Sequence, residues 1–181
     1  MKTIAIALAA VLAATFCGAA LQSRSKQDNK PTTYAGLTVE NSSPKRADKV
    51  IKTEAEWKKQ LTPEQFKILR AKDTEKPFCG GLLHVDKPGT FVCAGCNLPL
   101  FTTAAKFESG TGWPSFFQPA KRENVWLKVD RSYGMERYEV LCARCDGHLG
   151  HVFDDGPADK TGIRYCINSE SLKFVPDKKG E

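Results

Sequence analysis

The sequence lacks any long stretch in which lysine and arginine gather without acidic residues among them. It has 27 Lys and Arg against 21 Asp and Glu, a formal net charge of +6, and the acidic residues lie among the basic ones throughout. A nucleic-acid-binding protein usually concentrates its basic residues on one stretch or face. We therefore interpret the positive excess as incidental surface charge and expect no nucleic-acid partner.

Internal repeats and a regular alternation of strand and helix patterns are also missing. Without repeats the chain is not expected to form a solenoid, and without the alternation it is not expected to build a parallel α/β sheet. Its 181 residues, 41% hydrophobic and 27% charged, are sufficient for one soluble domain with polar additions. That composition is not typical of a membrane bundle.

The first 20 residues have the pattern of a signal peptide. Lys2 precedes an apolar stretch over 4–14, and the small residues 18–20 follow. A charged start, an apolar middle and a small-residue exit are typical of secretory signals. We therefore expect an exported protein, either periplasmic or secreted.

Two alternatives for this N-terminus stay open. The run over 4–21 is close to the minimum length for a membrane-spanning helix, so an uncleaved N-terminus would tether the protein to the membrane. The basic residues Arg24 and Lys26 beyond it argue against that orientation. Alternatively, Cys17 would be the lipid-modified residue of a lipoprotein, although the bulky Phe16 before it is unlike such sites.

Residues 21–50 are predicted to form a flexible linker. They are rich in polar residues and proline, with little apolar surface whose burial would offset the entropy of ordering. Beyond them we expect the folded domain over 51–176 and a polar tail over 177–181. Thr53 with Glu56, and Thr62 with Pro63, are start signals for two short helices. The apolar residues of those helices that we expect to be buried are Trp57, Leu61, Phe66 and Leu69.

From Pro77 onward, glycines interrupt short runs that are rich in β-branched and aromatic residues. Examples are the runs over 90–92, 125–129 and 138–141. Such runs between turn residues are typical of antiparallel strands. The predicted fold class is therefore mainly β, with a short helical lead-in.

Four of the seven cysteines form two CxxC pairs, Cys93 with Cys96 and Cys142 with Cys145. Two such turns can offer four thiolates to one tetrahedral Zn²⁺, and a zinc ion there would staple distant parts of the domain together. We expect one structural zinc per chain. Two disulfides are the alternative, because an exported protein meets oxidising conditions.

Cys166 and Cys79 remain as candidates for chemistry, since Cys17 is expected to leave with the signal. Arg164, Cys166 and Asn168 alternate along a plausible strand, so they share one face. A cation beside a thiol favours the reactive thiolate. The alternative is a buried cysteine that fills a gap in the core.

Two histidines, His148 and His151, follow the second CxxC pair on what we interpret as one loop. Imidazoles can supply a proton and raise the thiolate fraction nearby. The alternatives are zinc ligands or ordinary loop residues. Trp113, in a glycine-rich turn, is either an exposed aromatic of a pocket or part of the core.

Taken together, these motifs resemble the MsrB family of peptide-methionine (R)-S-oxide reductases over about residues 55–175. The motifs that carry the resemblance are the CxxC pair at 93–96, SGTGWPSF at 109–116, the CxxC pair at 142–145, HLGHVFDDGP at 148–157 and RYCINS at 164–169. The resemblance implies two antiparallel β-sheets with peripheral helices. It also implies zinc on the four CxxC cysteines.

The resemblance further implies that Cys166 is the catalytic cysteine. The matching site residues are Trp113, His148, His151, Phe153, Asp155, Arg164 and Asn168. Many members of the family carry a recycling cysteine where this chain has Thr111. Some members without it use an earlier cysteine, and Cys79 resembles that alternative. The other interpretation of Cys79 is a small buried apolar residue.

A mechanism follows as a hypothesis. The Cys166 thiolate attacks the sulfoxide sulfur while His148 and His151, oriented by Asp155 or water, protonate its oxygen. Trp113 and Phe153 hold the methyl group. Cys79 then forms a disulfide with Cys166, which a thioredoxin-like dithiol reduces.

We expect a monomer that acts mainly on peptide- or protein-bound methionine sulfoxide. Two other functions stay open at this point. One is a zinc-ribbon binding module without catalysis. The other is a zinc hydrolase with His148 and His151 as ligands.

Overall fold

A computed structural model describes residues 33–178 of the chain. Within this range it contains two α-helices, α1 (Glu54–Gln60) and α2 (Pro63–Leu69), and eleven strands. The strands are β1 (Thr33–Tyr34), β2 (Leu37–Thr38), β3 (Gly89–Cys93), β4 (Pro99–Thr102), β5 (Lys106–Phe107), β6 (Ser115–Phe116), β7 (Val125–Asp130), β8 (Arg137–Cys142), β9 (His148–Phe153), β10 (Arg164–Ile167) and β11 (Leu172–Pro176). The mainly β fold is confirmed.

Both helices begin as their sequences predict. Thr53 accepts a hydrogen bond from the backbone N–H of Glu56, and the Glu56 side chain accepts one from Thr53, which completes a capping box. Thr62 does the same with Gln65, and Pro63 occupies the first turn of α2. Trp57 of α1 is almost fully buried, so the short helices are held by packing as well as by their caps.

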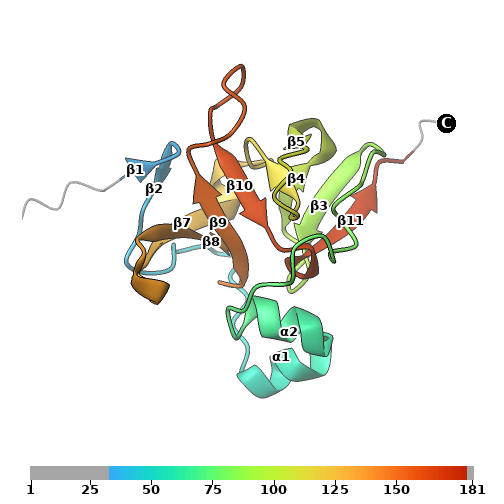
Figure 1. Cartoon of the computed structure of the whole chain (residues 1–181). Coiled ribbons are helices and arrows are strands. Elements are labelled where there is room, and N and C mark those ends of the chain that lie inside the picture. The colour runs from blue at the N-terminus through green and yellow to red at the C-terminus, as the bar shows by residue number, and fades with distance from the viewer. Residues whose placement is uncertain (1–32, 179–181) are drawn as a thin grey trace, which may run out of the picture. The chain divides into compact units, whose positions relative to one another are not determined.

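The strands form three sheets in the described part of the chain. The largest has the order β5-β6-β10-β9-β8-β7, the second has the order β11-β3-β4, and the third is the β1–β2 hairpin. Neighbouring strands are antiparallel in all three. Figure 1 shows β11, the last strand, beside β3, while the two helices lie together at one end of the domain.

The core lies between the two larger sheets and beneath the helices. Its largest fully buried side chains include Phe91 and Phe101 from the three-stranded sheet and Phe116 from the six-stranded sheet. Phe101 stacks on Phe116, with ring centroids 4.4 Å apart. The aromatic contact therefore joins the two sheets in one core.

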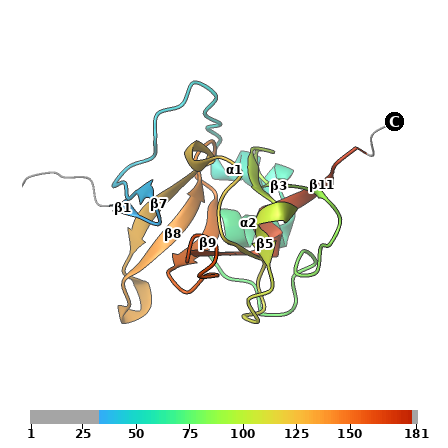
Figure 2. The ribbon, with the colours of Figure 1, turned by 90° about the horizontal axis from the view of Figure 1, so that it is seen from above.

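The third sheet corrects the prediction for part of residues 21–50. Ala35 and Gly36 both have positive φ, as a two-residue hairpin turn requires. Leu37 is buried, and the ring of Tyr34 stacks on that of Tyr138 at 4.2 Å. Figure 2 shows this hairpin beside β7, and Val39 forms a parallel bridge with Leu127.

After the hairpin, the backbone N–H of Glu40 donates to the Leu127 carbonyl and that of Val50 donates to the Arg144 carbonyl, so this segment lies along the domain. Tyr34 contacts Tyr138 of β8 and strand β2 contacts β7, and average composition does not reveal such contacts. The predicted signal peptide over 1–20, the rest of the linker and the last residues of the polar tail lie outside the described residues. Between residues 33 and 178 we find no helix with the length and apolar character needed to cross a membrane.

Candidate active site and metal centre

The two CxxC pairs form a pair of turns with the same backbone hydrogen bonds. The N–H of Asn97 donates to the carbonyl of Cys93, and the N–H of Asp146 donates to that of Cys142, each over 2.9 Å. Asn97 and Asp146 both adopt a positive φ, at 58° and 57°. The first turn follows β3 and the second lies between β8 and β9, so the two turns bring the two larger sheets together.

The four cysteine sulfurs converge at the place where these turns meet. The Sγ atoms of Cys93 and Cys145 lie 3.6 Å apart, those of Cys96 and Cys142 lie 3.5 Å apart, and all four lie within 4.8 Å of one another. With metal–sulfur bonds of about 2.3 Å, a tetrahedral site has sulfurs about 3.8 Å apart. A disulfide would need about 2.05 Å. The arrangement therefore fits a metal cation held by four thiolates, not two disulfides.

Cys166 lies on β10, in a small pocket that also collects several of the predicted site residues. The pocket measures about 130 Å³. Its lining residues are Thr74, Trp113, Arg137, Gly150, His151, Phe153, Cys166 and Asn168. Five of the residues predicted from the sequence thus converge on one cavity, whereas Thr74, Arg137 and Gly150 were not predicted.

The electrostatic surroundings of Cys166 differ from the prediction. Burial raises the pKa of the Cys166 thiol, and the opposing effects of Arg164 and of the hydrogen bond with Thr111 do not outweigh it. Arg164 thus favours the thiolate, as predicted, but removal of the thiol from water has the larger effect. Burial thus favours the thiol form of Cys166.

Asp155 pairs with Arg164 rather than with a histidine. Its two carboxylate oxygens each accept a hydrogen bond of 2.8 Å from the Arg164 guanidinium. The same guanidinium lies over the ring of Phe153, 4.6 Å from its centroid. Asp155 therefore fixes Arg164, and this corrects the expectation that Asp155 orients the histidines.

His148 and His151 lie on a strand, β9, and not on a loop as predicted. Residues three apart on a regular strand point to opposite faces. The register between β8 and β9 shifts here, so that Val140 pairs with Gly150 and Leu141 with His148. This bulge lets the two imidazoles approach each other, with centroids 5.5 Å apart.

Gly150 makes this arrangement possible. Its φ is 156°, and a Cβ atom there would lie 2.0 Å from the backbone carbonyl oxygen of Cys166. A side chain at this position would therefore push β9 away from β10, the strand that carries Cys166. A glycine between two histidines was the available sequence signal for this bulge.

Each histidine pairs with a different carboxylate. His151 Nε2 lies 2.8 Å from Asp130, and the buried His148 Nδ1 lies 2.8 Å from the buried Glu139. Burial lowers the pKa of His151, although Asp130 opposes the shift. Burial alone would raise the pKa of Glu139, but hydrogen bonds from His148 and Lys72 lower it overall.

Sequence reasoning missed both carboxylates. Asp130 and Glu139 lie on β7 and β8, two strands that were predicted without any functional role. Only the pairing of the strands brings these two carboxylates to the histidines. Glu139 of β8 stands directly opposite His151 of β9, and Asp130 of β7 reaches His151 from the next strand. Directly opposite residues project from the same face of a sheet, so Cys166, His151 and Glu139 form one row across three strands.

Glu75 is a further residue that the sequence did not single out. Its carbonyl accepts a hydrogen bond from the Trp113 indole, and its carboxylate accepts from the backbone N–H groups of Ser169 and Glu170. Its own N–H donates to the Asn168 side chain. Glu75 therefore fixes two walls of the Cys166 pocket from a segment distant in the sequence.

Cys79 is exposed and does not line the pocket. Its exposure excludes the alternative of a buried apolar residue. The loop that carries it touches the glycine-rich turn, because the N–H of Phe78 donates to the Gly112 carbonyl over 2.8 Å. In that turn the Thr111 hydroxyl lies 4.0 Å from the Cys166 sulfur.

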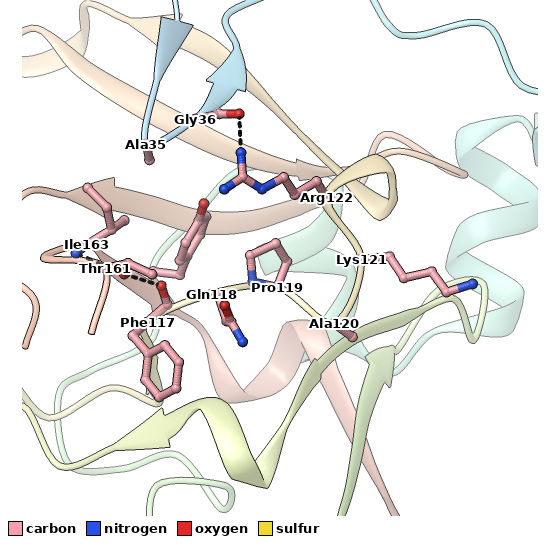
Figure 3. A pocket seen from close by; sticks show the side chains of 11 residues that line it. Ala35, Gly36, Phe117, Gln118, Pro119, Ala120, Lys121, Arg122, Thr161 and Ile163 are labelled. Atoms are coloured by element: carbon pink, nitrogen blue, oxygen red, sulfur yellow. Dashed lines mark hydrogen bonds between the residues drawn. The ribbon is translucent and has the colours of Figure 1, made fainter. Parts of the chain in front are cut away.

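A second hollow, of about 470 Å³, lies between the β1–β2 hairpin and residues 117–122 (Figure 3). In Figure 3 Arg122 extends toward the hairpin and donates a hydrogen bond to the Gly36 carbonyl over 2.9 Å. Tyr165 lines this hollow, while its neighbour Cys166 lines the other pocket. Successive strand residues face opposite ways, so this hollow lies on the other side of β10 from Cys166 and is not part of its pocket.

These features define a class of protein: a β domain with a tetracysteine metal site and a half-buried free cysteine in a pocket that a histidine and a tryptophan also line. Residues 61–176 match the family model of the SelR domain. The chain is 57% identical to the peptide methionine sulfoxide reductase MsrB of Bradyrhizobium diazoefficiens, over 71% of this chain and 92% of that protein. It is 58% identical to the protein of that name from Leptospira interrogans, over 69% of this chain and 95% of that protein.

The chain therefore belongs to the MsrB family of SelR-domain proteins. An archaeal relative of the same name, from Methanosarcina barkeri, is 55% identical over 73% of this chain and 92% of its own length. Among solved structures, the Mis18 "Yippee-like" domain covers 51% of this chain and 100% of its own at 19% identity, with a TM-score of 0.42. That likeness is too weak to bear on function.

Proposed function

We propose that this chain reduces the R epimer of methionine sulfoxide, mainly in peptides and proteins, with Cys166 as the nucleophile. Membership of the MsrB family supports methionine sulfoxide reduction as the reaction. One observation supports the roles that we assign to these residues: Cys166 and His151 stand directly opposite each other in a pocket that Trp113 also lines. The pocket thus offers a sulfur nucleophile, a proton carrier and an aromatic surface for a methyl group.

In the first step the Cys166 sulfur attacks the sulfoxide sulfur. His151 takes the thiol proton and passes it to the sulfoxide oxygen, which makes the sulfoxide sulfur a better electrophile. The oxygen is transferred to Cys166, methionine departs, and Cys166 becomes a sulfenic acid. The substrate sulfur is thereby reduced by two electrons and the Cys166 sulfur is oxidised by two.

Arg164 and His148 have supporting roles in this proposal. The Arg164 guanidinium, fixed by Asp155, stabilises negative charge on the Cys166 sulfur as the proton leaves. His148 is paired with Glu139 and lines the neighbouring groove instead of the Cys166 pocket. We therefore assign direct proton transfer to His151 and a positioning role to His148.

Recycling is assigned to Cys79. Its thiol condenses with the sulfenic acid, releasing water and forming a Cys79–Cys166 disulfide, which an external thioredoxin-like dithiol reduces. Support comes from the exposure of Cys79 and from the backbone contact between its loop and the turn of Thr111. The loop must move for the two sulfurs to meet.

The metal is proposed to be one structural Zn²⁺ per chain, held by Cys93, Cys96, Cys142 and Cys145. Four thiolates would leave no open position on the zinc for a substrate, so the ion would have a structural role. It would hold together the two larger sheets, which carry the two CxxC turns. A zinc hydrolase with histidine ligands is disfavoured, since His148 and His151 pair with carboxylates. Export of the protein and a monomeric state remain part of the proposal.

The deciding assay supplies the separate R and S epimers of a methionine sulfoxide peptide with dithiothreitol. Wild-type protein is expected to reduce the R epimer alone, and Cys166→Ser is expected to lose turnover while it keeps the metal and the fold. Retained turnover in Cys166→Ser would remove Cys166 as the nucleophile. Absence of turnover in the wild type would favour a zinc-ribbon binding module.

A further inference from the structure

The pocket of Cys166 has room for one side chain only. Sites that enclose drug-sized ligands measure about 300–1,000 Å³, whereas this pocket measures about 130 Å³. If the proposed function holds, the sulfoxide side chain fills the pocket and the rest of an oxidised polypeptide stays outside it. The flanking chain then needs a surface next to the pocket.

A larger hollow, of about 590 Å³, adjoins the pocket over strands β7, β8 and β9. We call it the β7–β9 groove. Thr74, Arg137 and His151 line both the pocket and the groove, so the two are continuous. Lys128 extends the row of Cys166, His151 and Glu139 onto β7, the edge strand, because it stands directly opposite Glu139.

One cation of the groove is left without a partner. The other charged residues that line the groove all have partners: Lys72 with Glu139 at 2.8 Å, Arg137 with Asp130 at 2.7 Å, Arg131 with Glu136 at 3.0 Å and Asp73 with Lys67 at 3.0 Å. Lys128 is exposed and makes no ion pair with any residue in the range 33–178. The carboxylates of the groove are thus engaged while one ammonium group is free, which suits an acidic partner.

The groove also offers an unmatched hydrogen-bonding atom. His148 Nδ1 is occupied by Glu139, but its Nε2 is buried and has no partner among the described residues. Buried polar atoms are usually paired, so the unpaired Nε2 of a residue that lines the groove marks a polar position in the groove wall. At the rim Tyr133 is 88% exposed and offers an aromatic surface.

We propose that the β7–β9 groove binds the polypeptide that flanks the methionine sulfoxide, and that Lys128 selects acidic residues near it. This inference rests on the proposed function. An Asp or Glu side chain of the bound segment pairs with the ammonium group of Lys128. The groove thereby makes the enzyme discriminate among oxidised sites by their sequence.

The test compares two short peptides with methionine (R)-sulfoxide at the centre, flanked on both sides by aspartates or by lysines. In the wild type, kcat/KM is expected to favour the acidic peptide by about fivefold, as for one exposed ion pair. Lys128→Glu is expected to reverse the preference, and Lys128→Ala to remove it. High salt is expected to weaken the preference of the wild type.

Lys173→Glu is the matched control, because Lys173 is an exposed lysine on β11 of the other large sheet. It is expected to keep the wild-type ratio. An equal ratio in wild type and Lys128→Glu would overturn the inference, as would the same reversal in Lys173→Glu. A small substrate, N-acetyl-methionine (R)-sulfoxide, separates the two claims, since its turnover by the wild type tests the proposed function alone.

Discussion

Cys166 and His151 are directly opposed across β10 and β9, so the proposed nucleophile and its proposed proton carrier belong to one cross-strand pair. The backbone hydrogen bonds of the sheet fix their spacing, and neither side chain depends on a mobile loop for its position. Behind them, Glu139 continues the row on β8. The proposed chemistry therefore depends on the register of strands β8, β9 and β10.

Alkylation of Cys166 tests its protonation state. Because burial raises its pKa, the rate of reaction with iodoacetamide should rise with a midpoint above that of an unperturbed cysteine. Arg164→Gln removes a cation that lowers this pKa, so the midpoint should move higher still. Rates are measured across pH in a Cys79→Ser background. A midpoint below that of a free thiol would contradict the electrostatic account.

Thr111 provides a test of recycling. Its hydroxyl lies 4.0 Å from the Cys166 sulfur, so a thiol at this position should reach the sulfenic acid directly. Cys79→Ser alone should lose turnover driven by thioredoxin, and Cys79→Ser with Thr111→Cys should regain it. Thr111→Ser in the same background is the matched control and should not regain it. Normal cycling by Cys79→Ser alone would exclude Cys79 from recycling.

Gly150→Ala should damage both the fold and the site. The added methyl group would lie 2.0 Å from the Cys166 carbonyl oxygen, which forces β9 and β10 apart. We expect a loss of about 2–4 kcal/mol in the free energy of unfolding and a fall in turnover. Gly81→Ala is the control, because nothing lies within 4 Å of a Cβ there. Equal stabilities in urea would refute the packing argument.

Glu139→Gln should change the response to acid. Hydrogen bonds from His148 and Lys72 hold the pKa of Glu139 below its usual range, so its carboxylate stabilises the folded state. That contribution is present above the unfolded pKa, about 4.3, and is lost as pH falls through the folded-state value.

The variant should therefore lose about 1–3 kcal/mol at pH 7 and show a flatter decline of stability below about pH 4.3. Urea unfolding at several pH values measures both effects. Glu123→Gln is a matched exposed control, because no ion pair of its side chain is found in the range 33–178. If the stability of the variant falls with decreasing pH as steeply as that of the wild type, Glu139 does not contribute to the acid dependence of stability.

Loss of the metal should lower the thermal stability of the domain. Cys96→Ser removes one of four ligands, so zinc content should fall and the melting temperature should drop by about 10 °C or more. Elemental analysis and thermal unfolding measure the two quantities, and Cys79→Ser should leave both at wild-type values. A purified wild type that contains two disulfides and no zinc would overturn the proposed metal site.

The sequence by itself determined much of the local structure. The capping residues Thr53 and Thr62 start the two helices, because each cap is satisfied within four residues of chain. The strand patterns over 90–92, 125–129 and 138–141 lie within β3, β7 and β8. The two CxxC pairs indicated a metal site, because each turn supplies two of the four sulfurs and only one contact between the turns is needed to complete the site.

Only the tertiary structure decided which groups share the active site. Asp155 lies close to the histidines in sequence but pairs with Arg164, while Glu139 and Asp130 reach the histidines from neighbouring strands. Residue patterns report local backbone preferences, whereas hydrogen-bonded register and burial depend on the whole fold. The packing of the β1–β2 hairpin beside β7 and the raised pKa of Cys166 also depend on the whole fold, through contacts between distant segments and through the exclusion of water.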